Sequence, residues 1–158
     1  MIFLRYNQER GTKLITQKTT DELLKILSDI RSESDLHTFS AELSREEKKI
    51  SFPEYLLSKM QEKEISLGRL WELSQIQRNY GYQILNGAKT PGRDKVIALC
   101  LSLSLSLEDT QRALSMANAG ALYARRKRDS ILIFSLGKEL SVMDTNILLA
   151  NFSEEPLN

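Results

Sequence analysis

Residues that interrupt helices are scarce in this chain, which has 7 glycines and 3 prolines among 158 residues. Hydroxyl residues that can cap a helix recur along it, each with an acid three positions later. These pairs are Thr19 with Glu22, Ser44 with Glu47, Ser51 with Glu54, Ser106 with Asp109, and Ser141 with Asp144. Apolar residues between the caps follow helical spacing, so the sequence predicts an all-α fold.

Helices are expected at residues 20–31, 35–43, 45–50, 52–63, 66–74, 77–86, 93–103, 107–117, 126–137 and 141–151. Leucine and serine alternate over residues 101–107, a pattern that taken alone is typical of a strand. We interpret it instead as a helix end followed by a helix start, with the turn at Ser104 and Leu105. Residues 1–19 are predicted to form either a hairpin or an arm that orders on a partner.

The net charge of +1 conceals an uneven distribution. Residues 51–128 carry twelve basic and seven acidic side chains, whereas the remainder from Asp129 carries one lysine and five acids. A basic middle segment favours contact with a polyanion, although scattered solvated charge would give the same count.

Several classes of protein are excluded by what the sequence lacks. No apolar run approaches the roughly 18 residues of a membrane span, and the short apolar start is no signal peptide, so we expect a cytoplasmic protein without a membrane. His37 is the only histidine and Cys100 the only cysteine, and Cys100 is expected in the core. Neither a metal site nor a phosphate-binding glycine loop can be built, so no enzyme, cofactor or metal is expected.

One segment carries specific information. Over residues 66–91, two short helices flank a tight turn at residues 74–76, and Gly87 stands where a left-handed helix stop is expected. The second helix and its exit contain Arg78, Gln83, Ile84, Gly87 and Pro91 in the spacing Arg-x-x-x-x-Gln-Ile-x-x-Gly-x-x-x-Pro. This segment resembles the lambda-repressor-like, xenobiotic-response-element type of helix-turn-helix domain. The longer pattern through Tyr123 and the basic residues after it is similar to small helix-turn-helix proteins of Firmicutes.

Two positions depart from the family's pattern. Gln75 occupies the turn position usually given to glycine, where a positive φ costs around a kcal/mol. Trp71 and Gly81 replace the small residue and the branched aliphatic that usually face each other between the two helices. Because one exchange enlarges and the other shrinks, packed volume is conserved, and we predict that Trp71 packs on Gly81.

The resemblance implies a five-helix DNA-binding domain over residues 51–117, with helical extensions at residues 20–50 and 118–158. The second helix of the motif would enter the major groove of double-stranded DNA. The residues expected to read bases are Gln77, Arg78, Asn79, Tyr80, Tyr82 and Gln83, although Tyr82 could instead only cover the seam at Gly81. The residues expected to hold phosphates are Ser66, Arg69, Asn86, Lys89 and Arg93.

The basic run Arg125, Arg126, Lys127 and Arg128 opens the next helix, where positive charge opposes the helix dipole. We expect it to meet an external anion, either a DNA backbone or an acidic patch on a partner chain. The last two helices carry more apolar residues than they can bury against each other, so they dock on the domain or across a two-fold axis. A homodimer is expected, because one helix-turn-helix contacts only a short half-site.

The implied function is sequence-specific DNA binding by a transcriptional regulator, with an autorepressor as one form of it. The alternative is an adaptor that uses the same fold to bind a protein partner without DNA. The modest net charge and the aromatic pair Tyr80 and Tyr82 would suit such an adaptor.

Overall fold

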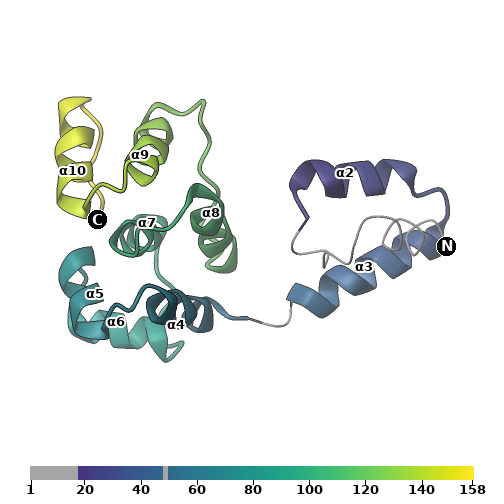
Figure 1. The fold of residues 1–158 in the computed structure, drawn as a ribbon, viewed down its shortest axis with the longest axis horizontal. Helices are drawn as coiled ribbons and strands as arrows, with labels where there is room; N and C mark the ends of the chain where they lie inside the picture. Colours follow the sequence, from purple (N-terminus) through teal and green to yellow (C-terminus); the bar gives the residue numbers. More distant parts are fainter. Residues whose placement is uncertain (1–17, 48–49) are drawn as a thin grey trace. The chain divides into compact units, whose positions relative to one another are not determined.

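A computed structural model describes residues 18–47 and 50–158, and every regular element within these ranges is an α-helix (Figure 1). The predicted all-α class is confirmed for this part of the chain, while the arm or hairpin expected at residues 1–19 lies almost wholly outside it. None of the described helices has both the length and the apolar character that crossing a bilayer requires. The chain divides into two units between Ile50 and Ser51, and each is described by itself.

The first unit contains α2 (Thr20–Asp29) and α3 (Glu33–Glu47), with Ile26 and Phe39 buried together. Thr19 forms the predicted capping box with Glu22. The break predicted before residue 45 is wrong, because α3 runs without interruption through Ser44. No glycine or proline lies within this stretch, and a serine inside a helix costs only about 0.5 kcal/mol relative to alanine.

The second unit is built around α7 (Arg93–Ser102), in which the six residues 96–101 are all buried. Helix α7 contacts α5, α8, α9 and α10. The other helices are α4 (Phe52–Glu62), α5 (Leu67–Ser74), α6 (Arg78–Leu85), α8 (Leu107–Met116), α9 (Lys127–Gly137) and α10 (Val142–Asn151). Leu132 and Leu149 of the last two helices share one core with Leu70 and Ile84, so residues 118–158 pack on the same interior as residues 51–117.

Three of the helix connections in this unit have the same short form. Each helix ends in a left-handed residue, which is followed by one apolar residue and then by a serine that caps the next helix. The left-handed residues are Glu64, Ser104 and Glu139, and the capping serines are Ser66, Ser106 and Ser141. The turn predicted at Ser104 is therefore confirmed, and the alternating leucines and serines do not form a strand.

The hairpins α7–α8 and α9–α10 repeat one pattern at an interval of 35 residues. Matching pairs are Arg93 and Arg128, Asp94 and Asp129, Ser106 and Ser141, Asp109 and Asp144, and Thr110 and Thr145. The segments that follow α8 and α10 match as well. Gln111 exchanges two hydrogen bonds with the backbone of Leu122, and Asn146, 35 residues after Gln111, accepts from the backbone N–H of Leu157. The two hairpins are thus copies of one structural unit.

Candidate nucleic-acid interface

The connection between α5 and α6 is three residues long and bends sharply at Gln75. This residue adopts φ 57° and ψ 26°, which is the left-handed conformation expected at this turn position. For a residue other than glycine, this conformation costs free energy. The N–H of Gln75 bonds to the carbonyl of Glu72, and that of Ile76 to the carbonyl of Trp71. Ile76 is buried, so its side chain anchors the turn in the core.

Trp71 lies directly against Gly81, as the paired exchange predicted. A Cβ atom added to Gly81 would stand 2.7 to 2.8 Å from three carbons of the indole ring. The ring of Tyr82 meets the same indole edge-on, with centroids 6.2 Å apart and planes inclined by 68°. Tyr82 is nevertheless 46% exposed. One edge of its ring thus packs on Trp71 while the rest of the side chain faces solvent. The indole Nε1 is buried and has no hydrogen-bond partner among the described residues.

The start of α6 presents polar groups that are free to bind something else. Gln77, Arg78, Asn79 and Gln83 are exposed, and none of their side chains forms a hydrogen bond or ion pair within residues 18–47 and 50–158. Gln77 occupies the N-cap position without a side-chain capping bond. Because Gly81 and Ile84 are buried on the other side of this helix, the polar face is held at a fixed orientation to the core.

Tyr80 behaves differently from these four residues. It is half-buried and packs against the core, and Lys95 places its ammonium 5.4 Å from the centre of the phenol ring. Lys95 lies on the first turn of α7, so a cation stands beside the polar face of α6. The sequence interpretation missed Lys95, since only the tertiary fold brings its ammonium over the Tyr80 ring.

The predicted phosphate contacts near the motif have local roles of their own. The Ser66 hydroxyl accepts the N–H of Arg69 at 3.2 Å, and the Arg69 guanidinium pairs with Glu72 at 2.8 Å on the exposed surface. The Asn86 side-chain oxygen accepts the N–H of Ala88. Lys89 is exposed and forms no ion pair with any described residue. Lys89 is thus the least encumbered cation of the predicted set.

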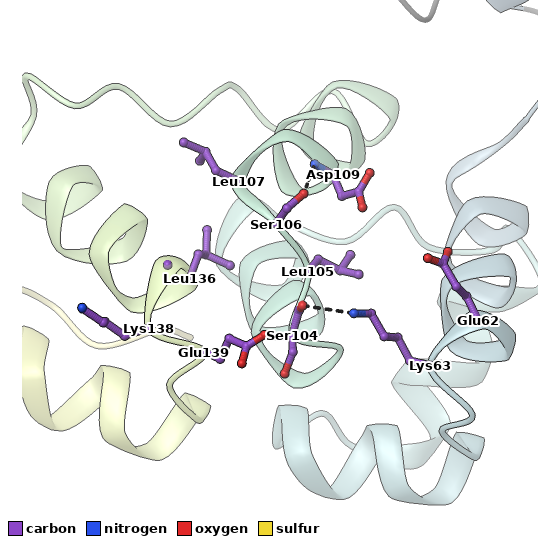
Figure 2. A pocket seen from close by; sticks show the side chains of 11 residues that line it. Glu62, Lys63, Ser104, Leu105, Ser106, Leu107, Asp109, Leu136, Lys138 and Glu139 are labelled. Atoms are coloured by element: carbon purple, nitrogen blue, oxygen red, sulfur yellow. Dashed lines mark hydrogen bonds between the residues drawn. The ribbon is translucent and has the colours of Figure 1, made fainter.

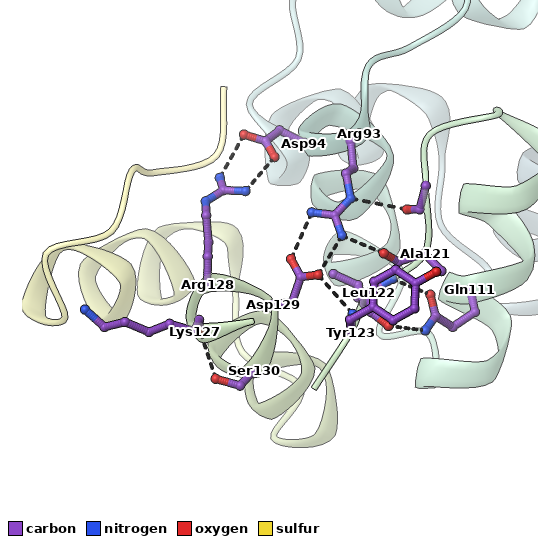
Figure 3. A network of polar contacts seen from close by, with 11 residues as sticks. Arg93, Asp94, Gln111, Ala121, Leu122, Tyr123, Lys127, Arg128, Asp129 and Ser130 are labelled. Atoms are coloured by element: carbon purple, nitrogen blue, oxygen red, sulfur yellow. Dashed lines mark hydrogen bonds and ion pairs between the residues drawn. The ribbon is translucent and has the colours of Figure 1, made fainter. Parts of the chain in front are cut away.

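The structure gives Arg93 intramolecular partners that the sequence did not predict (Figure 3). Its guanidinium forms two hydrogen bonds with the carboxylate of Asp129, both 2.9 Å, and two more with the carbonyls of Gly120 and Ala121. The hydrogen bonds with Asp129 raise the pKa of Arg93 above its usual range. Burial raises the pKa of Asp129, but bonds from Arg93 and from the N–H of Tyr123 outweigh it and lower the pKa overall. Arg93 therefore joins two hairpins, and its guanidinium is already bonded to four acceptor oxygens, while its phosphate contact stays a prediction.

Arg128 repeats these contacts in the second hairpin (Figure 3). It forms two hydrogen bonds with Asp94, at 3.0 and 2.8 Å. It donates two more to the carbonyls of Glu155 and Pro156. Since Arg93 reaches Asp129 while Arg128 reaches Asp94, the contacts are reciprocal, as across a two-fold axis. We call this pair of ion pairs the Arg-Asp clasp.

The basic run at residues 125–128 is accordingly only partly open to an external anion. Lys127 pairs with Glu154 at 3.4 Å and donates to the carbonyl of Phe152, so it and Arg128 meet the acidic tail of their own chain. These two residues thus already have partners within the chain, and an external anion stays a prediction for them. Arg125 and Arg126 remain exposed, and the Arg126 guanidinium lies 5.3 Å from the centre of the Tyr123 ring.

The remaining reactive side chains belong to other helices. Cys100 is buried on α7, and burial raises the pKa of its thiol to about 12, which keeps it uncharged, as a core cysteine should be. His37 is exposed on α3 and lies 3.7 Å from Glu33. A depression of about 700 Å³ opens where α4, the α7–α8 turn and the end of α9 meet (Figure 2). It has charges of both signs and no residue of α6.

The surface that could recognise a nucleic acid thus consists of the exposed start of α6, with Lys89 and Lys95 beside it. Arginine, asparagine and glutamine side chains can form paired hydrogen bonds with base edges, and lysines can neutralise phosphates. Comparisons with protein-family models, with curated proteins and with solved structures find no match for this chain.

Proposed function

We propose that the protein is a sequence-specific DNA-binding regulator of the lambda-repressor-like type, which reads the major groove with α6. The observation that carries the proposal is the exposed start of this helix. Its side chains Gln77, Arg78, Asn79 and Gln83 have no partners among the described residues, yet the helix is anchored by buried Gly81 and Ile84. Exposed polar groups on a rigid support are what recognition of a fixed pattern of base edges requires.

The dimensions and the chemistry of α6 suit this role. A helix of about 10 to 12 Å in diameter fits a major groove about 12 Å wide, with its first turns closest to the bases. Arg78 can bond a guanine edge in two places, and Asn79 or Gln83 can do the same at an adenine. Tyr82, held at its base by Trp71, can contact a thymine methyl group with its exposed edge.

Affinity without sequence preference would come from cations around the helix. Lys89 follows α6 in the chain, and Lys95 stands over Tyr80. Arg69 and the amino end of α5 can approach the backbone on the other side of the motif, although Arg69 would exchange its exposed pair with Glu72 for a phosphate. Arg93 takes no part, because the Arg-Asp clasp holds it.

Fluorescence anisotropy on duplexes selected from a random pool tests the proposal. Arg78→Ala should weaken the selected site by about 1 to 3 kcal/mol and leave binding to random duplex nearly unchanged. Lys89→Ala should weaken all duplexes alike and reduce the slope of log K against log salt by about one. Lys138→Ala removes the same charge at the end of α9 and serves as the control that should change neither quantity.

Two results would count against DNA reading. If no duplex binds at low salt, the fold is better explained as the adaptor considered above, which would use the same polar face for a protein. If Arg78→Ala weakens random and selected duplexes equally, α6 contacts the backbone only and does not read bases.

A further inference from the structure

The buried indole of Trp71 reaches a side chain on the exposed face of α6. It lies across Gly81, where a Cβ atom would stand 2.7 to 2.8 Å from three carbons of the ring. It also meets the ring of Tyr82 edge-on, with centroids 6.2 Å apart and planes inclined by 68°, an arrangement that aromatic pairs prefer. Because Gly81 has no side chain, the indole lies close enough to α6 to contact the residue that follows.

Tyr82 belongs to the face of α6 that carries the proposed base-reading side chains. It follows Arg78 by four residues and Asn79 by three, spacings that place side chains next to one another on a helix. Tyr82 is 46% exposed, whereas Tyr80 is half-buried, packs on the core and faces Lys95. Of the two tyrosines of this helix, Tyr82 is therefore the one whose ring stands among the exposed polar groups.

The packing of Trp71 on Gly81 is not the most stable way to fill the space between α5 and α6. The indole Nε1 is buried without a hydrogen-bond partner among the described residues, and a buried N–H without a partner costs free energy. A glycine inside α6 adds a further cost relative to alanine. An aliphatic side chain at position 71 with alanine at position 81 would fill the space without either cost. Packing alone therefore does not account for the aromatic pair.

The contact with Trp71 restricts the motion of Tyr82 before any ligand binds. An exposed side chain exchanges between rotamers, and ordering it in a complex costs entropy. A ring that already packs on a buried neighbour has less of that freedom to lose. The turn before α6 is held separately, because the N–H of Ile76 bonds to the backbone carbonyl of Trp71 at 3.2 Å. A change in the side chain of Trp71 thus alters the support of Tyr82 and leaves the acceptor of this bond in place.

We infer that Trp71 is a positioning residue for base recognition, which holds the ring of Tyr82 against the 5-methyl group of one thymine in the recognised site. The inference rests on the proposed function, since it requires α6 to lie in the major groove, where that methyl group is displayed. Trp71 itself is only 4% exposed, so its effect on recognition passes through Tyr82.

Replacement of thymine by uracil in a selected duplex removes only the 5-methyl group and tests this contact. For the wild type, fluorescence anisotropy should show one thymine whose replacement weakens binding about fourfold, the equivalent of one buried methyl group. Tyr82→Ala should bind the two duplexes equally. The double variant Trp71→Leu with Gly81→Ala keeps apolar groups between the helices and should lose most of this discrimination, because its Tyr82 ring has no indole to pack on.

Recognition by Arg78 provides the control for a merely structural effect. The double variant should keep the helical circular dichroism of the wild type and should still lose affinity for the selected site when Arg78→Ala is added. If it loses its helical signal, Trp71→Met with Gly81→Ala takes its place, since methionine adapts to irregular spaces. A folded variant that retains the discrimination against uracil overturns the inference, and so does a wild type that binds thymine and uracil duplexes equally at every position.

A measurement without DNA separates this inference from the proposed function. Trp71 is the only tryptophan, so its near-ultraviolet circular dichroism reports on its surroundings. Tyr82→Ala should reduce this signal, whereas Tyr123→Ala, which removes a tyrosine that is 57% exposed and outside α6, should leave it unchanged. An unchanged tryptophan signal in Tyr82→Ala overturns the positioning of Tyr82 by Trp71, even if DNA binds. If the signal falls but no duplex binds at low salt, the proposed function and the thymine contact are both overturned, while the contact between the two rings stands.

Discussion

Because Trp71 packs on Gly81, the substitution Gly81→Ala should lower the free energy of unfolding when the Trp71 ring is present and raise it when the ring is absent. Gly81→Ala adds one methyl group inside α6, where replacing glycine with alanine normally stabilises a helix by about 1 kcal/mol. Here the new Cβ would stand 2.7 to 2.8 Å from three ring carbons of Trp71, closer than atoms can pack. Overpacking of this kind costs about 1 to 3 kcal/mol, so the net effect should be a loss of up to about 2 kcal/mol.

Removing the ring should reverse that effect. Trp71→Ala alone should lower the free energy of unfolding by about 3 to 5 kcal/mol, because the ring is buried. In that background, Gly81→Ala meets open space and should stabilise by about 1 kcal/mol, which gives a coupling energy of about 1 to 3 kcal/mol.

Urea denaturation followed by far-ultraviolet circular dichroism measures all four proteins of this cycle, since Trp71 is the only tryptophan and its fluorescence is lost in two of them. Equal losses from Gly81→Ala in both backgrounds would refute the reasoning. Such additivity would mean that the two residues do not touch in solution and that the paired exchange is not a packing device.

Three further outcomes follow from the clasp and the core. Asp129→Asn should lower the free energy of unfolding at pH 7 by about 3 kcal/mol, because it leaves Arg93 without its charged partner. The pKa of Asp129 is lowered from 3.8 in the folded state, so the stability that it contributes is present above pH 3.8 and is lost as the pH falls through the folded value. The free energy of unfolding of Asp129→Asn should therefore depend less on pH in this acid range than that of the wild type. Equal pH dependence in the two proteins would contradict the assignment. Arg93→Ala should destabilise the fold while the salt slope of DNA binding stays unchanged, whereas a slope smaller by one would restore Arg93 as a phosphate contact. Cys100 should not react with a thiol reagent at pH 8 until urea unfolds the chain, and rapid labelling of the native protein would show that the thiol is accessible.

Local features of the fold were predictable because they depend on residues close together in the chain. Serine and threonine caps fix helix starts through a bond to an N–H three positions on, and Ser51, Ser106 and Ser141 all do so. The same rule failed at Ser44, which lies inside α3. A serine starts a new helix only where the helix before it has already been interrupted, and nothing in the residues before Ser44 interrupts α3. The pairing of Trp71 with Gly81 was predictable because a motif of known spacing brings the two positions together.

The contacts of the basic side chains could not be predicted from their positions near the motif. Arg93 and Lys95 are both on the first turn of α7, yet one faces Asp129 and the other faces Tyr80. Which neighbour each of these side chains meets depends on how the helices of this unit pack. One signal in the sequence did point to the role of Arg93: the pair Arg-Asp recurs 35 residues later, with matching Ser-Asp-Thr positions after it.

The sequence by itself determined the helices, their caps and the polar start of α6, because each depends on contacts within about four residues. The sequence also determined that the large ring of Trp71 requires a glycine at the position that faces it in the motif. Only the tertiary structure decided which charges remain free. Arg93 and Arg128 are 35 residues apart in the chain, and a reciprocal packing of two hairpins brings each to the other's aspartate. An ion pair between distant residues forms only when the core has placed both backbones, so no local pattern can distinguish an arginine that binds a phosphate from one that holds the fold together.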